Sequence, residues 1–139
     1  MIPKVRLTGV RQKGILYERA FGKWLAGEFP DREIRSDQWI CFEDKVGKGY
    51  ACIDHYVVLP HAVLLFECKL TWTKRAWWQL EHRYRPLLRE IHQRPVCTIQ
   101  VCRNLSAPVP ARVRRTPREL AEHPEAGRFT FVWRRPLYG

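Results

Sequence analysis

The sequence predicts an α/β domain with a central mixed sheet, helices on both of its faces and the element order α-β-β-β-α-β. Three observations support this prediction. The chain of 139 residues has the length of one domain. Hydrophobic residues make up 45% of it and six residues are tryptophan, which is enough apolar material for one core. Apolar residues recur at helical spacing in two stretches and form strand-like runs in four others.

The regular elements can be assigned in order along the chain. A first helix is expected at residues 15–28, where apolar residues recur every three or four positions and Gly27 provides a stop. Four stretches rich in β-branched and aromatic residues are bounded by Gly, Pro or charge, as is typical of strands. They are residues 37–44, 50–59, 62–70 and 95–102. A second long helix follows the third strand, with Thr73 as its N-cap and a kink or division at Pro86.

The chain changes in character at residue 106, where prolines and arginines become frequent. Residues 1–105 therefore form the core, and residues 106–139 form a basic Pro- and Arg-rich extension of the same domain. Thr116, Pro117 and Glu119 have the spacing of a capping box, which predicts a short helix at 117–123. Residues 128–133 are expected to form a late strand.

The charge of the chain indicates a polyanionic partner. Lysine and arginine total 25 against 14 acidic residues, which gives a formal net charge of +11. Nucleic acid is the first candidate for that partner and an anionic membrane is the second. The longest uncharged apolar run, residues 57–66, is too short to span a membrane, and the basic N-terminus lacks the apolar segment of a signal peptide. A cytoplasmic protein without membrane attachment is expected.

The five cysteines are odd in number and include no CxxC pair. We expect them to be small reduced residues of the core, with a disulfide or a zinc site as the alternative.

Three ionisable residues interrupt the most apolar part of the sequence: Asp54, Glu67 and Lys69. If residues 60 and 61 form a tight turn, directly opposed residues have numbers that sum to 121, so that Asp54 faces Glu67. Lys69 projects from the same face as Glu67 because side chains alternate along a strand. A slip of one residue would turn Asp54 to the other face, and an ordinary polar pair at a sheet edge is the alternative interpretation.

These residues resemble the PD-(D/E)XK nuclease superfamily. The resemblance covers residues 17–103 and consists of Asp54, twelve intervening residues and the ExK triplet from Glu67 to Lys69, on a hairpin between two helices. It implies a restriction-endonuclease-like core. Ile53 stands where the name of the superfamily has proline. Gln79 and Tyr84 are similar to the QxxxY signature of one nuclease branch, with a spacing that is one residue longer.

The resemblance also implies the roles of the site residues. Asp54 and Glu67 would bind one or two divalent metal ions, Mg²⁺ or Mn²⁺, and Lys69 would assist the attacking water or the transition state. Glu18 on the first helix would complete the site, with the main-chain carbonyl of Cys68 as a further ligand. The chemistry agrees independently, because carboxylate oxygens suit Mg²⁺ and a divalent ion serves phosphodiester hydrolysis. A solvated helix residue is the alternative for Glu18.

Arg75, Gln79 and Arg83 recur every four residues on the second long helix, and we expect them on the DNA side of the cleft with Gln79 nearest the metal. A solvated helix face is the alternative for the two arginines. The arginine cluster of the extension is the plainest group for contacts with phosphates, with a solubilising tail as the alternative. Its members are Arg112, Arg114, Arg115 and Arg118. His55 is expected in the core and His82 in solvent.

We therefore predict a metal-dependent DNA endonuclease that hydrolyses phosphodiester bonds, with branched or flapped DNA as its expected substrate. The first alternative is a non-catalytic nucleic-acid-binding protein on the same fold. The second is an interaction domain whose basic surface meets an acidic protein or a membrane. A homodimer is expected, because cutting both strands of a duplex with one active centre per chain usually needs two chains. The late strand would either serve as its pairing edge or pack over the core.

Overall fold

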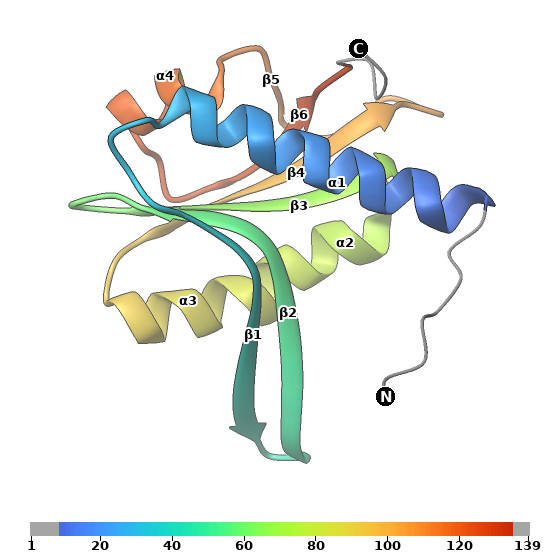
Figure 1. Cartoon of the computed structure of the whole chain (residues 1–139). Coiled ribbons are helices and arrows are strands. Elements are labelled where there is room, and N and C mark those ends of the chain that lie inside the picture. The colour runs from blue at the N-terminus through green and yellow to red at the C-terminus, as the bar shows by residue number, and fades with distance from the viewer. Residues whose placement is uncertain (1–8, 135–139) are drawn as a thin grey trace, which may run out of the picture.

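The structure is a computed structural model that describes residues 9–134, and Figure 1 shows the arrangement of its elements. The helices are α1 (Gly9–Glu28), α2 (Lys74–Gln79), α3 (Arg85–His92) and α4 (Pro117–Glu122), and a π-helical turn, η1 (Leu80–Tyr84), joins α2 to α3. The strands are β1 (Ile34–Asp44), β2 (Gly47–Val58), β3 (Val63–Thr71), β4 (Val96–Asn104), β5 (Arg112–Val113) and β6 (Arg128–Val132).

The six strands form one mixed sheet in the order β1-β2-β3-β4-β6-β5. β1, β2 and β3 are antiparallel neighbours, and the pairs β3 with β4, β4 with β6 and β6 with β5 are parallel. The predicted α/β class and mixed sheet are thus confirmed. The hairpin register is confirmed as well, because β2 and β3 pair from Val58 with Val63 to His55 with Phe66. β3 is an inner strand, so its charged residues are not an edge pair.

Helices cover both faces of the sheet, as predicted. α1 lies on one face, and α2, η1 and α3 lie on the other (Figure 1). The core under α1 includes Phe21 and Phe66, and the core under the other helices includes Leu65 and Leu80. Adjacent residues 65 and 66 of β3 thus point into opposite cores, so this strand is buried on both sides. Ile91, in the last turn of α3, is 54% exposed.

The β1–β2 hairpin bends where it leaves the sheet. Ile53 and Tyr56 pack in the same core although they are three positions apart, whereas regular alternation would place them on opposite faces. Between the pairs Ser36–His55 and Gln38–Ile53 the register sets Asp37 opposite Asp54, and Asp37 has a φ of 51°. The far part of the hairpin then extends beyond α3, at the bottom of Figure 1.

The remaining predictions of elements hold with small changes. The helix predicted after β3 begins with Thr73, whose hydroxyl accepts a hydrogen bond from the Ala76 amide, and it is divided before Pro86. α4 has the predicted capping box between Thr116 and Glu119. β6 lies between β4 and β5, so the expectation that this late strand offers a free pairing edge is wrong.

Three of the five cysteines are buried, but Cys41 is exposed and Cys52 is partly exposed. The prediction of small core residues is therefore wrong for these two, which lie on the hairpin. All five thiols are free, so the structure has no disulfide among them. Within residues 9–134, no helix has the length and apolar character that a membrane crossing requires.

Candidate active site

The acidic residues of the hairpin and the neighbouring lysine meet at the end of the β2–β3 pairing. Oδ2 of Asp54 accepts a hydrogen bond of 2.8 Å from the backbone amide of Cys68, the residue that follows Glu67. The Glu67 side chain is buried, with the residue 5% exposed, and its Oε1 lies 3.6 Å from Nζ of Lys69. The structure therefore brings these three side chains together, as the sequence predicted, although the register pairs themselves end one position earlier.

The carboxyl groups are held in conditions that oppose their ionisation. Burial raises the pKa of Glu67 to about 8, the charge of Asp54 adds to the increase, and Lys69 opposes it. Burial also raises the pKa of Asp54, while the hydrogen bond from the Cys68 amide acts in the opposite direction. Both groups would be stabilised in their ionised form by a cation placed between them.

Glu18 of α1 belongs to the same group of carboxyl side chains. Burial is the main reason that the pKa of Glu18 rises to about 8. The charge of Asp54 and a side-chain hydrogen bond with Asp37 add to the increase. Two carboxyl groups can share a hydrogen bond only when one of them carries a proton. Glu18 is partly buried beside these carboxyl groups, so it is not a fully solvated helix residue.

Asp37 is a residue of this site that the sequence analysis missed. It lies directly across from Asp54 in the register of β1 and β2, at the bend of the hairpin. The sequence contains a signal for this position, because Asp44 and Gly47 flank a two-residue turn. With a turn there, the numbers of directly opposed residues sum to 91, which sets Asp37 opposite Asp54. The left-handed φ of 51° is one that aspartate tolerates better than most residues.

His55 holds α1 against the opposite face of β2. Its ring is buried, and Nε2 lies 2.9 Å from the main-chain carbonyl of Glu18 while Nδ1 lies 2.7 Å from Oγ of Ser36. A carbonyl only accepts, so Nε2 donates, and Nδ1 of the neutral ring accepts from the serine hydroxyl. Burial lowers the pKa of His55, in agreement with a neutral ring. The prediction of a core histidine is confirmed, and this histidine fixes the backbone that carries Glu18.

A cavity of about 440 Å³ opens beside the carboxyl cluster on the α2 side of the sheet. It is lined by Glu67, Lys69, Thr73, Arg75, Ala76, Gln79 and Tyr84. Gln100 of β4 fixes the start of α2 at this cavity, because its side-chain amide bonds both the amide and the carbonyl of Thr73. Arg75 and Gln79 thus line the same cavity as Glu67.

The π-helical turn explains the unusual spacing of Gln79 and Tyr84. A π-helical turn accommodates one residue more than an α-helical turn, so residues five apart lie on one face, as residues four apart do in an α-helix. Both side chains accordingly line the same cavity. Arg128 of β6 ties this region to the sheet, because its Nη1 donates to the Trp77 carbonyl at 3.0 Å and its guanidinium lies 4.3 Å from the centroid of the Trp77 ring.

The same turn separates Arg83 from Arg75. Arg83 lines a different cavity, of about 280 Å³, between the β1–β2 hairpin and the helices, where Phe42 and Trp78 are neighbours. The four-residue spacing predicted one stripe, but that spacing applies only to a continuous α-helix. The expectation that Arg83 shares a face with Arg75 and Gln79 is therefore wrong. His82 is exposed, as predicted.

The arginines of the C-terminal extension lie across the sheet. Glu67 pairs with Gln100 of β4, which pairs with Thr130 of β6, and Thr130 pairs with Arg112 of β5. Arg112 therefore lies directly in line with Glu67, three strands away in one row of register partners. At the usual strand spacing this row places the two Cα atoms about 14 Å apart. Arg112 and Arg114 are exposed, whereas Arg115 is partly buried.

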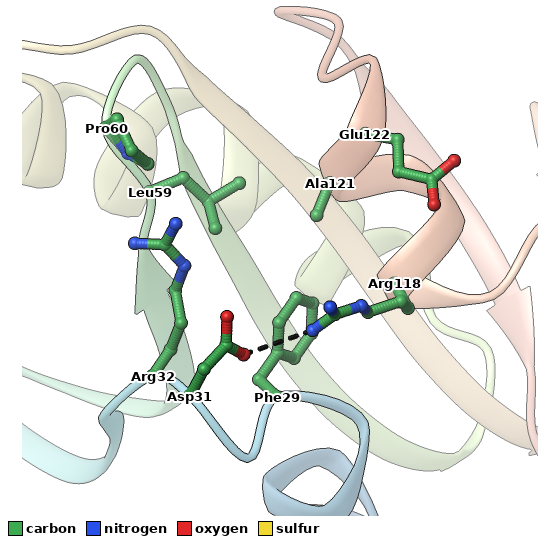
Figure 2. A pocket seen from close by; sticks show the side chains of 8 residues that line it. All are labelled: Phe29, Asp31, Arg32, Leu59, Pro60, Arg118, Ala121 and Glu122. Carbon is green, nitrogen blue, oxygen red and sulfur yellow. Dashed lines mark hydrogen bonds and ion pairs between the residues drawn. The ribbon is translucent and has the colours of Figure 1, made fainter.

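Arg118 has a structural role at the opposite end of the sheet. It lines a cavity of about 190 Å³ beside the β2–β3 turn. Figure 2 shows the side chains around this cavity. Nη1 of Arg118 donates to Oδ1 of Asp31 at 3.1 Å and to the main-chain carbonyl of Glu28 at 3.2 Å. These bonds hold α4 against the end of α1, so this guanidinium is already engaged within the fold.

The carboxyl cluster offers oxygen donors of the kind that a divalent cation prefers. In the described part of the chain, no group of three or more His, Cys, Asp or Glu side chains could hold a metal ion as placed. However, Oε2 of Glu67 is buried and has no hydrogen-bond partner among the described residues. Mg²⁺ is commonly held by one or two carboxylates together with waters, so Glu67 and Asp54 fit such an ion.

Comparisons with known proteins give no further identification, because no family model, curated protein or solved structure matched this chain. The fold and site therefore define an α/β domain with a buried cluster of carboxyl groups beside a lysine.

Proposed function

We propose that this protein is a divalent-metal-dependent DNA endonuclease with a restriction-endonuclease-like core of the PD-(D/E)XK type. One observation carries the proposal: Oε2 of Glu67 is buried without a partner among the described residues, next to the carboxyl group of Asp54. A buried, unpaired carboxylate oxygen costs free energy unless a proton or a cation satisfies it. A binding domain without catalysis has no need for that cost.

Asp54 and Glu67 would hold the ion, with Glu18 completing the group, as hard oxygen donors suited to Mg²⁺ or Mn²⁺. When bound, such an ion supplies charge neutralisation at the phosphate and a nucleophile from water near neutral pH. The Cys68 amide fixes Asp54 through its hydrogen bond, and Asp37 adds a fourth carboxyl group opposite Asp54 in the register. The chain therefore orients its carboxyl groups through its own contacts.

The side chains around the cavity suit a phosphodiester. The Lys69 ammonium lies next to Glu67 and is partly exposed, so it can offset phosphate charge and orient a water. Arg75 and Gln79 line the same cavity and carry donors for phosphate oxygens. Tyr84 is a neutral donor at physiological pH, and burial raises its pKa further, to about 12.

DNA is the proposed substrate because of the charge and its placement. The chain carries a formal net charge of +11, and binding that releases counterions from phosphates accounts for most non-specific affinity. Arg112 lies in line with Glu67 across the sheet, at a separation of about 14 Å, which is within the width of a duplex.

The test combines cleavage with metal and DNA binding. Purified protein is incubated with supercoiled plasmid and with a four-way junction, in Mg²⁺, Mn²⁺ or EDTA. We expect nicking that requires metal and is lost in Asp54→Asn, Glu67→Gln and Lys69→Ala, while DNA retardation is retained. Calorimetric titration of Mn²⁺ should show binding by the native chain and none by Glu67→Gln.

Glu122→Gln is the matched control, because Glu122 is exposed on α4 at the other end of the sheet. It should bind Mn²⁺ and nick plasmid as the native chain does. Retardation of DNA without cleavage in every metal would overturn the nuclease and leave the non-catalytic nucleic-acid-binding alternative.

A further inference from the structure

Two large aromatic side chains are exposed on the β1–β2 hairpin. Trp39 is 72% exposed and Tyr50 is 70% exposed, whereas most other aromatic residues of the described chain pack in the two cores. Exposed aromatic surface of this kind usually marks an interaction site.

The register places both side chains on the same face of the hairpin. Trp39 pairs with Cys52 and Tyr50 pairs with Cys41, so the two aromatic residues are diagonal neighbours across the strands. Ala51 and the other alternating residues pack into the core under η1 and α3, so Trp39 and Tyr50 project from the opposite, outer face. We call Trp39 and Tyr50 the aromatic platform.

The aromatic platform adjoins the carboxyl cluster. Trp39 is two residues from Asp37, which the register sets opposite Asp54. Cys52, the partner of Trp39 in the register, is two residues from Asp54, so the platform and the carboxyl groups lie on consecutive positions of the same two strands. A chain that passes through the site can therefore reach the platform within a few residues or nucleotides.

The charges around the site differ on its two sides. The hairpin, residues 34–58, carries three basic residues against four acidic ones, so it has no excess positive charge to hold the phosphates of a duplex. On the other side of Glu67, Lys69 and Arg75 line the cavity and Arg112 lies further along the sheet. Phosphates are thus attracted to one side of the cluster, and flat apolar groups are accepted on the other.

Unpaired nucleobases match the aromatic side of the site. Each base has a π-face that stacks on tryptophan or tyrosine whatever its identity, whereas the bases of an intact duplex are already stacked on one another. A protein partner would match exposed rings as well, but it gives no reason for their position next to a carboxyl cluster and a phosphate-attracting surface.

We propose that Trp39 and Tyr50 stack unpaired bases next to the cleaved phosphodiester, so that the preferred substrate is DNA in which a duplex meets a single strand. This inference rests on the proposed function. It gives that function a substrate class: the duplex lies over the basic side and the single strand lies along the hairpin.

The test measures binding in EDTA, so that cleavage does not enter. Fluorescence anisotropy gives the dissociation constants for an oligothymidine, a flapped duplex with a thymidine arm, and the same duplex without the arm. The double variant Trp39→Ala, Tyr50→Ala should lose about ten-fold or more in affinity for the first two probes and less than about two-fold for the duplex. Trp39→Phe should retain most of the affinity, because it retains a stacking ring.

Trp78→Ala is the matched control, since Trp78 is also exposed but lies on α2, beside the inner face of the hairpin. It should bind all three probes as the native chain does. Circular dichroism of each variant checks that the fold is retained.

The outcomes separate this inference from the proposed function. If the double variant binds every probe normally while Asp54→Asn abolishes cleavage, stacking is refuted and the nuclease stands. If the double variant loses affinity for single strands but no metal supports cleavage by the native chain, the stacking stands and the nuclease fails. If light scattering shows that the double substitution only converts a dimer to a monomer, the platform is an interface between copies and the inference is overturned.

Discussion

Replacement of Gly22 by alanine should destabilise the protein, because the backbone of α1 approaches the sheet at this residue. A Cβ atom at position 22 would lie 2.5 Å from Cε1 of His55, which is closer than real Cβ contacts occur. The histidine ring cannot move aside freely, since it is buried and both of its nitrogens are hydrogen-bonded. This contact decides how close the helix can lie to the sheet.

The size of the effect follows from opposing contributions. Overpacking in a core costs about 1–3 kcal/mol, and loss of a buried hydrogen bond to the ring adds about 1 kcal/mol. Alanine in place of glycine within a helix gains roughly 0.5–1 kcal/mol. We therefore expect Gly22→Ala to lower the free energy of unfolding by about 1–3 kcal/mol. Gly14→Ala is the matched control in the same helix, because nothing lies within 4 Å of its Cβ, and it should raise stability by roughly 0.5–1 kcal/mol.

Urea unfolding followed by circular dichroism gives both free energies by linear extrapolation. A double-mutant cycle with His55→Ala measures the contact itself, because the smaller side chain at position 55 should relieve the strain of Gly22→Ala. If Gly22→Ala and Gly14→Ala have equal stability, or if the cycle shows no coupling, the close approach of α1 to His55 is not a feature of the protein.

Three further predictions concern buried groups. Tyr17→Phe should lower the free energy of unfolding by about 1–2 kcal/mol in thermal or urea denaturation, since the Tyr17 hydroxyl donates a buried hydrogen bond of 2.8 Å to the Trp133 carbonyl. Glu67 has a pKa raised from 4.5 to about 8, so the unfolded chain releases this proton first and the metal-free protein should lose stability as the pH rises through that interval. Glu67→Gln should remove this part of the loss. In urea titrations at pH 4, 6 and 8, the variant should therefore gain stability relative to the native chain only at pH 6 and 8. Arg128→Gln should cost about 1–2 kcal/mol and speed amide exchange in η1, measured by mass spectrometry, because it removes the bond to the Trp77 carbonyl and the stacked guanidinium.

The hairpin at the site could be predicted because its register depends on local signals. A tight turn at Pro60 and alternating apolar residues fixed which side chains share a face, and the pairs from Val58 with Val63 onward follow that rule. The convergence of Asp54 with Glu67 followed from the same rule. The capping box of α4 is equally local, and it was found for the same reason.

The features that sequence reasoning missed depend on departures from regular geometry. Asp37 enters the cluster only because β1 and β2 bend together at positions 37 and 54, and strand patterns assume that no such bend occurs. Arg83 was misplaced because a π-helical turn changes the phase of the helix after Gln79, and no composition signal marks that turn. Both departures lie beside the carboxyl cluster: the bend brings Asp37 to it, and the π-helical turn brings Tyr84 to the cavity that Glu67 lines.

The divergence of β2 from β3 both opens the site and creates a structural demand on Asp54. Beyond His55 and Phe66 the two strands no longer pair, so the Cys68 amide needs another acceptor, and Oδ2 of Asp54 fills that position at 2.8 Å. Asp54 thus replaces a missing backbone partner while it presents a carboxyl group to Glu67. Asp54→Asn retains an acceptor oxygen and should keep the free energy of unfolding of the metal-free protein within about 0.5 kcal/mol or raise it, because it also removes a buried charge. Asp54→Ala leaves the amide unpaired and should cost about 1–3 kcal/mol. Equal stability of the two variants in urea denaturation would show that this hydrogen bond does not hold the divergent strands, and the geometry of the site would then need another cause.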